Sequence, residues 1–182
     1  MTRTVTVPQP VTSLTVQSYG APVQITSWAG DRVQVTETIS YDDRAGGLPP
    51  VTESVSGGHL LLADPVCSGS GPSAAGCRVS FALTVPAGLS VAVVTDGGAA
   101  LLAFAAPPES VSVSTGGGPA TVIVPGGPYA LTADSGGGPE SIGIATSPDA
   151  ARSITVGPWA SAGRRTFFFL TERAVVLAPG TA

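Results

Sequence analysis

The chain of 182 residues contains no lysine, and its eight basic residues are all arginine. Schiff-base chemistry needs a lysine amine, and a P-loop needs a lysine to grip phosphate, so both kinds of site are excluded. The formal net charge is −4 at pH 7, which leaves no basic surface for a phosphate backbone. We therefore expect no nucleic-acid partner.

Charged residues are scarce, since they make up only 11% of the chain, about half the usual share. Helix surfaces normally carry Glu, Lys and Arg, whereas Thr, Ser and Val are abundant here, which favours strands. No apolar run approaches the roughly 18 residues that a membrane-crossing helix needs. We therefore expect no membrane span in this chain, and residues 1–10 also lack the apolar centre of a signal peptide.

Groups suited to catalysis are few. His59 is the only histidine, and although Ser56 and Asp64 are near it in the sequence, neither lies in the nucleophile motif of a serine hydrolase. Asp42-Asp43 is the only acidic pair, and it gives faint support to a carbohydrate-acting enzyme on a β-helical scaffold. We assign no catalytic residue and expect the protein not to be an enzyme.

Metal ligands are equally sparse. Calcium-binding glycine-aspartate repeats place an aspartate in each turn, but the turn at 115–119 reads Thr-Gly-Gly-Gly-Pro and has none. The residue twenty positions after Asp96 is Gly116, so the acidic residues of the turns do not form an equivalent set. We expect no metal site and no cofactor.

The two cysteines, Cys67 and Cys77, enclose a loop of small and turn-forming residues. Such a loop has no core of its own, and a crosslink would contribute roughly 3 kcal/mol in the chain-entropy model. The spacing is far from a two-residue cysteine motif, so we favour a structural disulfide and keep two free thiols as the alternative. Disulfides persist outside the cytosol, so the pair points to an extracytoplasmic protein.

Glycine and proline are abundant, at 24 and 17 residues, and glycine clusters recur about every twenty residues. The clusters are Gly97-Gly98, Gly116-Gly117-Gly118 and Gly136-Gly137-Gly138. Each lies between short runs in which apolar and small polar residues alternate, which is the pattern of strands with one buried face. A fixed period near twenty predicts a repeat protein in which each copy is one supersecondary unit.

The repeat is clearest at 89–144. Stacked copies would align two interior columns, the first formed by Val91, Val111 and Leu131, the second by Phe104, Val124 and Ile144. A fourth, irregular copy runs through Ile154 and Val156. The N-terminal half follows the pattern more loosely, and residues 51–62 have the character of a β-hairpin around Gly57-Gly58.

We therefore predict an all-β fold in which residues 1–182 form a single repeat domain. The favoured architecture is a β-solenoid or β-helix-like stack of short strands with repeats of about 20 residues. In that arrangement each residue touches its partner about twenty positions on. A β-sandwich or meander is the alternative.

Residues 157–178 contain an aromatic and basic segment. Neighbours on a strand point to opposite faces, so the phenylalanines of the run at 167–169 cannot all point inward. The segment is either a cap that closes the end of the stack or a docking surface for a partner. The candidate interface residues are Trp159, Arg164, Arg165, Phe167, Phe168 and Phe169.

Residues 77–91, Cys-Arg-Val-Ser-Phe-Ala-Leu-Thr-Val-Pro-Ala-Gly-Leu-Ser-Val, resemble a segment of the bacterial putative-adhesin β-strand-repeat family, a domain of unknown function. Its members share the cysteine, the Val-Pro-Ala-Gly step and Thr-Asp-x-Gly turns, which Thr95-Asp96-Gly97-Gly98 fits. The resemblance extends over most of 14–156. It implies a β-helix-like or solenoid fold, commonly on an extracytoplasmic domain behind a membrane anchor, and supplies no catalytic residue. The later turns here are glycine-rich where members often keep an acidic residue.

These observations favour a non-enzymatic cell-surface or envelope module for binding, adhesion or scaffolding. Its partner would be a surface ligand or protein whose identity the sequence leaves open. The alternative is a self-assembling structural protein that forms oligomers or filaments through edge strands and the aromatic run. We expect an extracytoplasmic location as an ectodomain without its anchor, with a cytoplasmic location as the alternative.

Overall fold

The computed structural model describes residues 1–40, 51–64, 78–95, 97–115, 118–125, 130–133, 153–157 and 167–171. These residues form strands and turns, and none of them belongs to a helix that could cross a membrane. In chain order the strands are β1 (Thr2–Thr6), β2 (Ser13–Ser18), β3 (Val23–Trp28), β4 (Gln34–Ser40), β5 (Thr52–Ser56), β6 (His59–Ala63), β7 (Arg78–Pro86), β8 (Ser90–Thr95), β9 (Ala100–Ala103), β10 (Ser110–Thr115), β11 (Ala120–Val124), β12 (Ala130–Ala133), β13 (Ser153–Gly157) and β14 (Phe167–Thr171).

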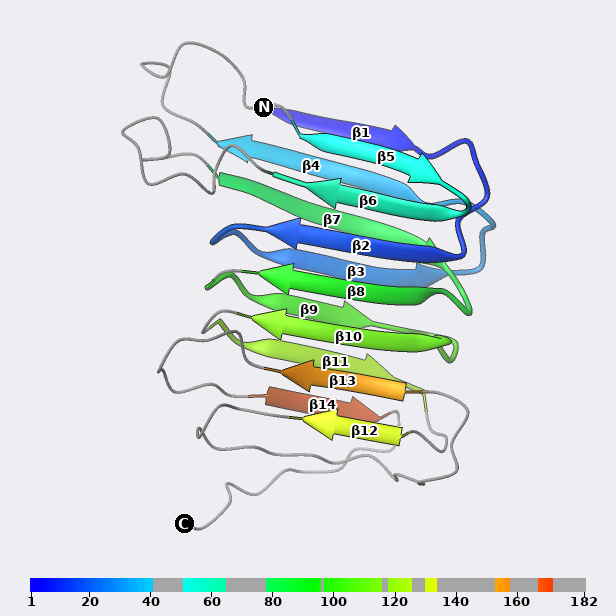
Figure 1. The fold of residues 1–182 in the computed structure, drawn as a ribbon, viewed down its shortest axis with the longest axis vertical. Coiled ribbons are helices and arrows are strands. Elements are labelled where there is room, and N and C mark those ends of the chain that lie inside the picture. The colour runs from blue at the N-terminus through cyan, green and yellow to red at the C-terminus, as the bar shows by residue number, and fades with distance from the viewer. Residues whose placement is uncertain are drawn as a thin grey trace.

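The strands form two seven-stranded sheets that face each other, with the strands running across the long axis (Figure 1). Sheet A has the order β1-β4-β7-β3-β9-β11-β14, and sheet B has the order β12-β13-β10-β8-β2-β6-β5. The expected all-β class is confirmed. Two sheets packed face to face fit the sandwich alternative.

Alternating side chains create the core between the sheets. In β2, Leu14 and Val16 are buried while Ser13, Thr15 and Gln17 are less so, and the same pattern recurs in β8 and β10. The largest fully buried side chains are Phe81, Leu14, Ile25, Leu60, Leu62, Leu83 and Leu102. Period-two patterning therefore fills one interior from both sheets, as the sequence predicted.

Strands of the repeat pair in parallel with a constant offset of about twenty residues. Val111 pairs with Val91 in sheet B, and Val122 pairs with Leu102 in sheet A. The strands on either side of the first two glycine turns of the repeat belong to opposite sheets: β8 and β10 lie in sheet B, and β9 and β11 lie in sheet A. This is the pairing expected for stacked copies.

The first expected column is only partly confirmed, because Leu131 is not next to Val111. Val91 and Val111 are neighbours, but Ile154 pairs with Val111 on one side and with Leu131 on the other. Strand β13 therefore lies between β10 and β12, which the twenty-residue period alone does not show. In the second column the Phe104 amide donates to the Ile123 carbonyl at 2.8 Å, and Ile144 lies outside the described residues.

The N-terminal part departs from parallel pairing. Strand β4 is antiparallel to both β1 and β7, and β5 is antiparallel to β6. The expected hairpin at 51–62 is confirmed: Gly57 and Gly58 connect β5 to β6 with φ angles of 57° and 79°. Two consecutive residues with positive φ are what a tight two-residue hairpin turn requires, and glycine adopts them without strain.

Buried hydroxyl groups close the stacked turns. Thr95 Oγ1 donates to the Gly98 carbonyl at 2.6 Å, and Thr115 Oγ1 donates to the Gly118 carbonyl at 2.6 Å. Ser18, which pairs with Thr95, makes the corresponding bond to the Ala21 carbonyl at 3.2 Å. In these three turns a hydroxyl thus satisfies a carbonyl three residues later.

Successive turns approach so closely that only glycine fits in the later ones. A Cβ on Gly98 would lie 2.2 Å from the Ala21 carbonyl oxygen, and one on Gly118 would lie 2.1 Å from the Gly98 oxygen. Gly97 differs because a Cβ there would meet nothing within 4 Å, although its φ of +81° disfavours a side chain. The two adjacent glycines are therefore required for different reasons.

Substitution of these two glycines separates steric overlap from backbone strain. We expect Gly98→Ala to lower the free energy of unfolding by about 3 kcal/mol or more, because the obstructing atoms are backbone that cannot rotate away. Gly97→Ala should cost only about 1–2 kcal/mol through its left-handed conformation. Urea unfolding of both variants measures the difference, and equal losses would contradict the close stacking of turns.

Candidate binding groove on the outer face of sheet A

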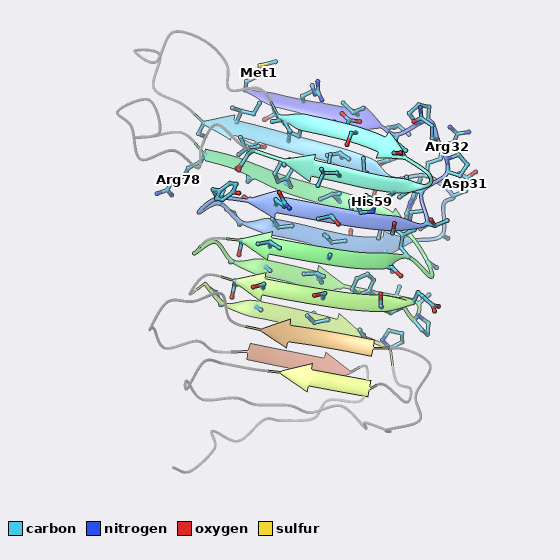
Figure 2. All side chains as sticks on the ribbon, in the orientation of Figure 1. Met1, Asp31, Arg32, His59 and Arg78 are labelled. Atoms are coloured by element: carbon cyan, nitrogen blue, oxygen red, sulfur yellow. The ribbon has the colours of Figure 1, made fainter. Side chains whose placement is uncertain are left out.

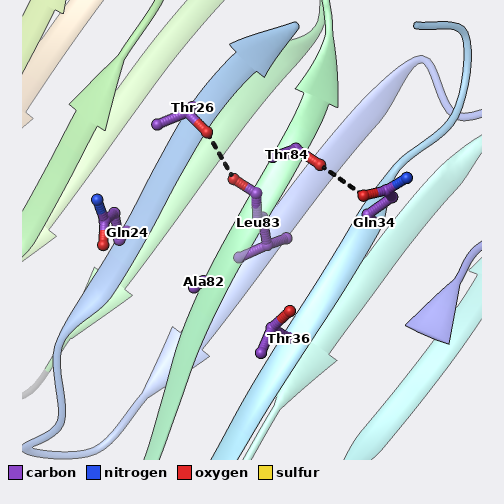
Figure 3. A pocket seen from close by; sticks show the side chains of 7 residues that line it. All are labelled: Gln24, Thr26, Gln34, Thr36, Ala82, Leu83 and Thr84. Carbon is purple, nitrogen blue, oxygen red and sulfur yellow. Dashed lines mark hydrogen bonds between the residues drawn. The ribbon is translucent and has the colours of Figure 1, made fainter. Parts of the chain in front are cut away.

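The outward-facing side chains of three adjacent strands surround a shallow hollow on sheet A (Figure 3). Strand β7 forms its floor, with β3 on one side and β4 on the other. The hollow has a volume of about 220 Å³. Its lining residues, named here the sheet A groove, are Gln24, Thr26, Gln34, Thr36, Ala82, Leu83 and Thr84. All but Leu83 face outward; the Leu83 side chain is buried in the core.

Strand register explains why the surface is hollow at this point. Gln24 pairs with Ala82, and Ala82 pairs with Thr36, so the smallest side chain of this row lies in the middle. In the next row Thr26 pairs with Thr84, which pairs with Gln34. Paired residues on neighbouring strands share a face, so the missing bulk at Ala82 leaves a depression between longer polar side chains.

Hydrogen bonds hold part of the groove rim in place. Thr84 Oγ1 donates to Gln34 Oε1 at 3.4 Å, and Thr26 Oγ1 donates to the Leu83 carbonyl at 3.3 Å (Figure 3). Thr36 Oγ1 lies 3.2 Å from Thr4 Oγ1 on β1. The Gln24 amide has no hydrogen-bond partner among the described residues, and the bond to Gln34 uses only its oxygen. Two amide groups therefore keep donors available to a ligand.

The groove carries no charge. Among the described outward-facing residues of β3, β4 and β7, Arg78 alone is ionisable, and it lies at the start of β7. It is four residues from Ala82, which corresponds to about 13 Å along a strand. Figure 2 places Arg78 at one side of the sheets and Asp31 and Arg32 at the other. The groove lies on the neutral stretch between these charges.

An exposed tryptophan lies at the end of β3, the strand that forms one side of the groove. Trp28 follows Thr26 by two positions on β3 and is 39% exposed. Its indole Nε1–H donates to the Arg32 carbonyl at 3.0 Å. A Cβ on Gly30 would lie 2.2 Å from Trp28 Cζ2, so the ring packs directly against this glycine. Arg32 Nη1 in turn donates to the Pro8 carbonyl at 2.7 Å, which fastens the turn that supports the indole.

The catalytic candidates come together only in part: Ser56 pairs with His59 across the β5–β6 hairpin, but Asp64 lies apart from them. His59 begins β6, is exposed, and its Nδ1 lies 2.9 Å from Ser13 Oγ. Asp64 is five residues farther along, about 16 Å on an extended strand, so it cannot orient the imidazole. Asp42, Asp43 and Asp96 lie outside the described residues. Within the described ranges no three His, Cys, Asp or Glu side chains are grouped to hold a metal ion.

The other expected site residues are placed only in part. Cys67, Cys77, Trp159, Arg164 and Arg165 lie outside the described residues, so the disulfide and most of the aromatic segment stay predictions. The phenylalanine run is the first part of β14, the edge strand of sheet A. Phe168 pairs there with Thr121 of β11, next to Phe167 and Phe169.

The groove itself was missed by sequence reasoning. Gln24, Gln34 and Ala82 occupy outward positions of alternating strands, which the sequence indicates. Their proximity depends on β4 pairing antiparallel with β7 across the segment 41–77, and no local pattern predicts that register. The one available signal was the large aromatic Trp28 beside the turn residues Ala29, Gly30 and Asp31.

Two buried carboxyl groups, those of Glu37 and Asp64, lie away from the groove. Arg3 bridges the sheets at the N-terminal end, with Nε 3.2 Å from Glu37 and Nη2 3.1 Å from Glu53. Burial raises the pKa of Glu37, Arg3 opposes that effect and Glu53 adds to it. Burial also raises the pKa of Asp64 from 3.8 to about 7, although the Tyr19 amide donates to its carboxyl at 3.2 Å.

Asp64 should make stability depend on pH. Its folded-state pKa exceeds the unfolded value, so the stabilisation is complete below about pH 4 and is lost as pH rises through about 7. The difference between the folded-state and unfolded-state pKa values of Asp64 corresponds to about 4 kcal/mol of folding free energy. We expect Asp64→Asn to flatten the plot of unfolding free energy against pH over this window, whereas Glu109→Gln at an exposed position should not. An unchanged slope in Asp64→Asn would contradict the assignment.

Comparison with known proteins finds similarity in fold alone. No protein-family model and no curated protein sequence matches the chain. The fold is similar to the crystal structure of a putative cell adhesion protein from Clostridium sporogenes ATCC 15579, with a TM-score of 0.54 and 13% identity over 93% of this chain and 99% of that one. A putative adhesin from Bacteroides fragilis NCTC 9343 matches over 93% and 97% of the two chains, with 9% identity and a TM-score of 0.29, too low to support an argument.

Proposed function

We propose that the protein is a non-enzymatic adhesion-type module that binds a partner outside the cell through the sheet A groove. The observation that carries this proposal is the hollow over Ala82, flanked by the amides of Gln24 and Gln34. Unsatisfied donors around a depression can bind a ligand without first breaking internal hydrogen bonds. The fold is also similar to that of a putative cell adhesion protein, which is consistent with an adhesion-type role.

Rigidity of the surface favours binding over catalysis. The groove residues lie on central strands β3, β4 and β7, each of which has hydrogen-bonded strands on both sides. A site on such strands is already in its binding geometry, so little conformational entropy is lost when a partner docks. The described residues around it include no nucleophile paired with a base, and the role left is recognition.

We infer further that residues 1–182 form a single all-β repeat domain. The parallel offset of about twenty residues supports a solenoid-like coil through the repeats, which would present its outer faces as continuous flat surfaces. The edge position of β14 suits either a cap or an interface at 157–178. The alternative partner is a second copy of the chain, bound through that edge strand.

Filling the hollow tests the binding surface. Ala82 is exposed, so Ala82→Trp should fold normally yet lower partner binding at least tenfold by occupying the space between Gln24 and Thr36. Ser112→Trp, also exposed but on the outer face of sheet B, is the matched control. Beads carrying each variant are tested against a printed panel of cell-wall polymers, glycans, extracellular-matrix proteins and the chain itself.

The outcomes of this panel separate the alternatives. A partner whose binding is lost in Ala82→Trp and kept in Ser112→Trp supports the groove. Binding that neither substitution alters places the interacting surface elsewhere. If the chain itself is the bound partner and Ala82→Trp has no effect, the self-assembling alternative is favoured instead.

We also propose an extracytoplasmic location with a Cys67–Cys77 disulfide. The proposal rests on the short loop between the cysteines and on the fold likeness. Protein from fractionated native cells is alkylated without reduction and weighed intact. We expect the envelope fraction to contain a mass without alkyl groups, and a doubly alkylated mass in the cytoplasmic fraction would overturn both the disulfide and the location.

A further inference from the structure

We propose that the sheet A groove binds an uncharged oligosaccharide, with Trp28 as the platform for one of its rings. This inference rests on the proposed function and names the ligand class of the same site. It depends on three features that have to act together: free amides, absence of charge and a supported indole ring.

The side-chain amides of Gln24 and Gln34 can hydrogen-bond to the hydroxyl groups of a saccharide ring. A saccharide ring carries several hydroxyl groups, each of which donates one hydrogen bond and accepts others. Gln24 offers an amide with two donors and an acceptor, and Gln34 offers the amide nitrogen that Thr84 leaves unused. Ala82 between them provides room for the ring. Neutral donors and acceptors facing each other across a hollow suit neighbouring hydroxyls.

The lack of charge selects against acidic ligands. Phosphate, sulfate and carboxylate groups are normally held by arginine, lysine or a helix N-terminus. The chain has no lysine, the described residues form no helix, and the Arg78 backbone is four residues, about 13 Å, from Ala82 along β7. Arg32 lies near Trp28, and its Nη1 donates to the Pro8 carbonyl at 2.7 Å. At the hollow itself, an acidic group would therefore lose hydration without gaining a partner charge, whereas the hydroxyls of a neutral saccharide would exchange water for the amide hydrogen bonds.

Trp28 supplies an apolar surface for the C–H face of a sugar. Contact with Gly30 supports one side of the ring and the bond to the Arg32 carbonyl fixes its edge, so the exposed 39% is a preorganised surface. Trp28 lies about 6.6 Å beyond Thr26 along β3 on the face that Gln24 and Thr26 share. A linear oligosaccharide lying along β7 would therefore reach both the hollow and the indole.

Affinity at one site should be weak. The hollow of about 220 Å³ is smaller than the roughly 300–1,000 Å³ of typical small-molecule pockets. An open site of this size buries little of a ligand, so we expect weak binding by a single chain. Many copies on a surface would raise the effective strength by avidity, which is how weak sites serve attachment.

The test follows Trp28 directly by fluorescence. The chain has two tryptophans, so Trp159→Phe leaves Trp28 as the only indole. In that background, cellohexaose, maltohexaose, chitohexaose and mannohexaose are compared with polygalacturonate and hyaluronan oligomers. We expect at least one neutral series to shift the Trp28 emission saturably. Gln24→Ala should weaken that binding at least fivefold, and Ser112→Ala should leave it unchanged.

A second variant isolates the platform without deleting it. Gly30→Ala would force the indole away from its support, because the new Cβ would overlap the ring. We expect at least a threefold loss of oligosaccharide affinity with little change in unfolding midpoint. Unchanged affinity in Gly30→Ala would overturn the role of Trp28 as platform.

The results distinguish failure of this inference from failure of the proposed function. If the groove binds a protein or a charged polymer in an Ala82→Trp-sensitive way and no neutral oligosaccharide, the ligand class is wrong and the binding function stands. If nothing binds in an Ala82→Trp-sensitive way, both are wrong. Neutral-oligosaccharide binding that Gln24→Ala and Ala82→Trp both reduce supports the inference.

Discussion

The close vertical stacking of glycine turns is the constraint on which the structure depends. Gly98 lies against the Ala21 carbonyl and Gly118 against the Gly98 carbonyl, at separations that exclude a side chain. Hydroxyls of Thr95 and Thr115 close these turns from within. Because each of these turns packs on the previous one, the strands of the first two copies pair in parallel, β8 with β10 and β9 with β11, and the core columns follow from that register.

Strand register elsewhere in sheet A determines the shape of the outer surface. A column of paired residues reads as one stripe across several strands, so a single small residue among longer ones makes a depression. Ala82 has this position between Gln24 and Thr36. No loop or flexible segment is needed to build the groove, in contrast to the many proteins whose binding residues lie on loops.

Sequence reasoning succeeded where partners were related by a constant offset. Val91 and Val111 were predicted as neighbours because their copies match, and the hairpin at 51–62 because two glycines allow positive φ. It missed the insertion of β13 beside β10, since Ile154 is 43 residues after Val111 and no period links them. The groove escaped for a similar reason: Gln34 and Thr84 meet through an antiparallel pairing fifty residues apart.

The direction of the interstrand hydrogen bonds determines how the protein would respond to tension. In Figure 1 the strands lie across the long axis, so the bonds between neighbours point along it. Tension along that axis would load these bonds one ladder at a time, as in the opening of a zipper, and not all together in shear. The ion pairs of Arg3 with Glu37 of β4 and Glu53 of β5 lie at the N-terminal end and would be the first contacts to bear that tension. A protein of this build would lengthen stepwise under tension and dissipate force as successive strand pairs separate.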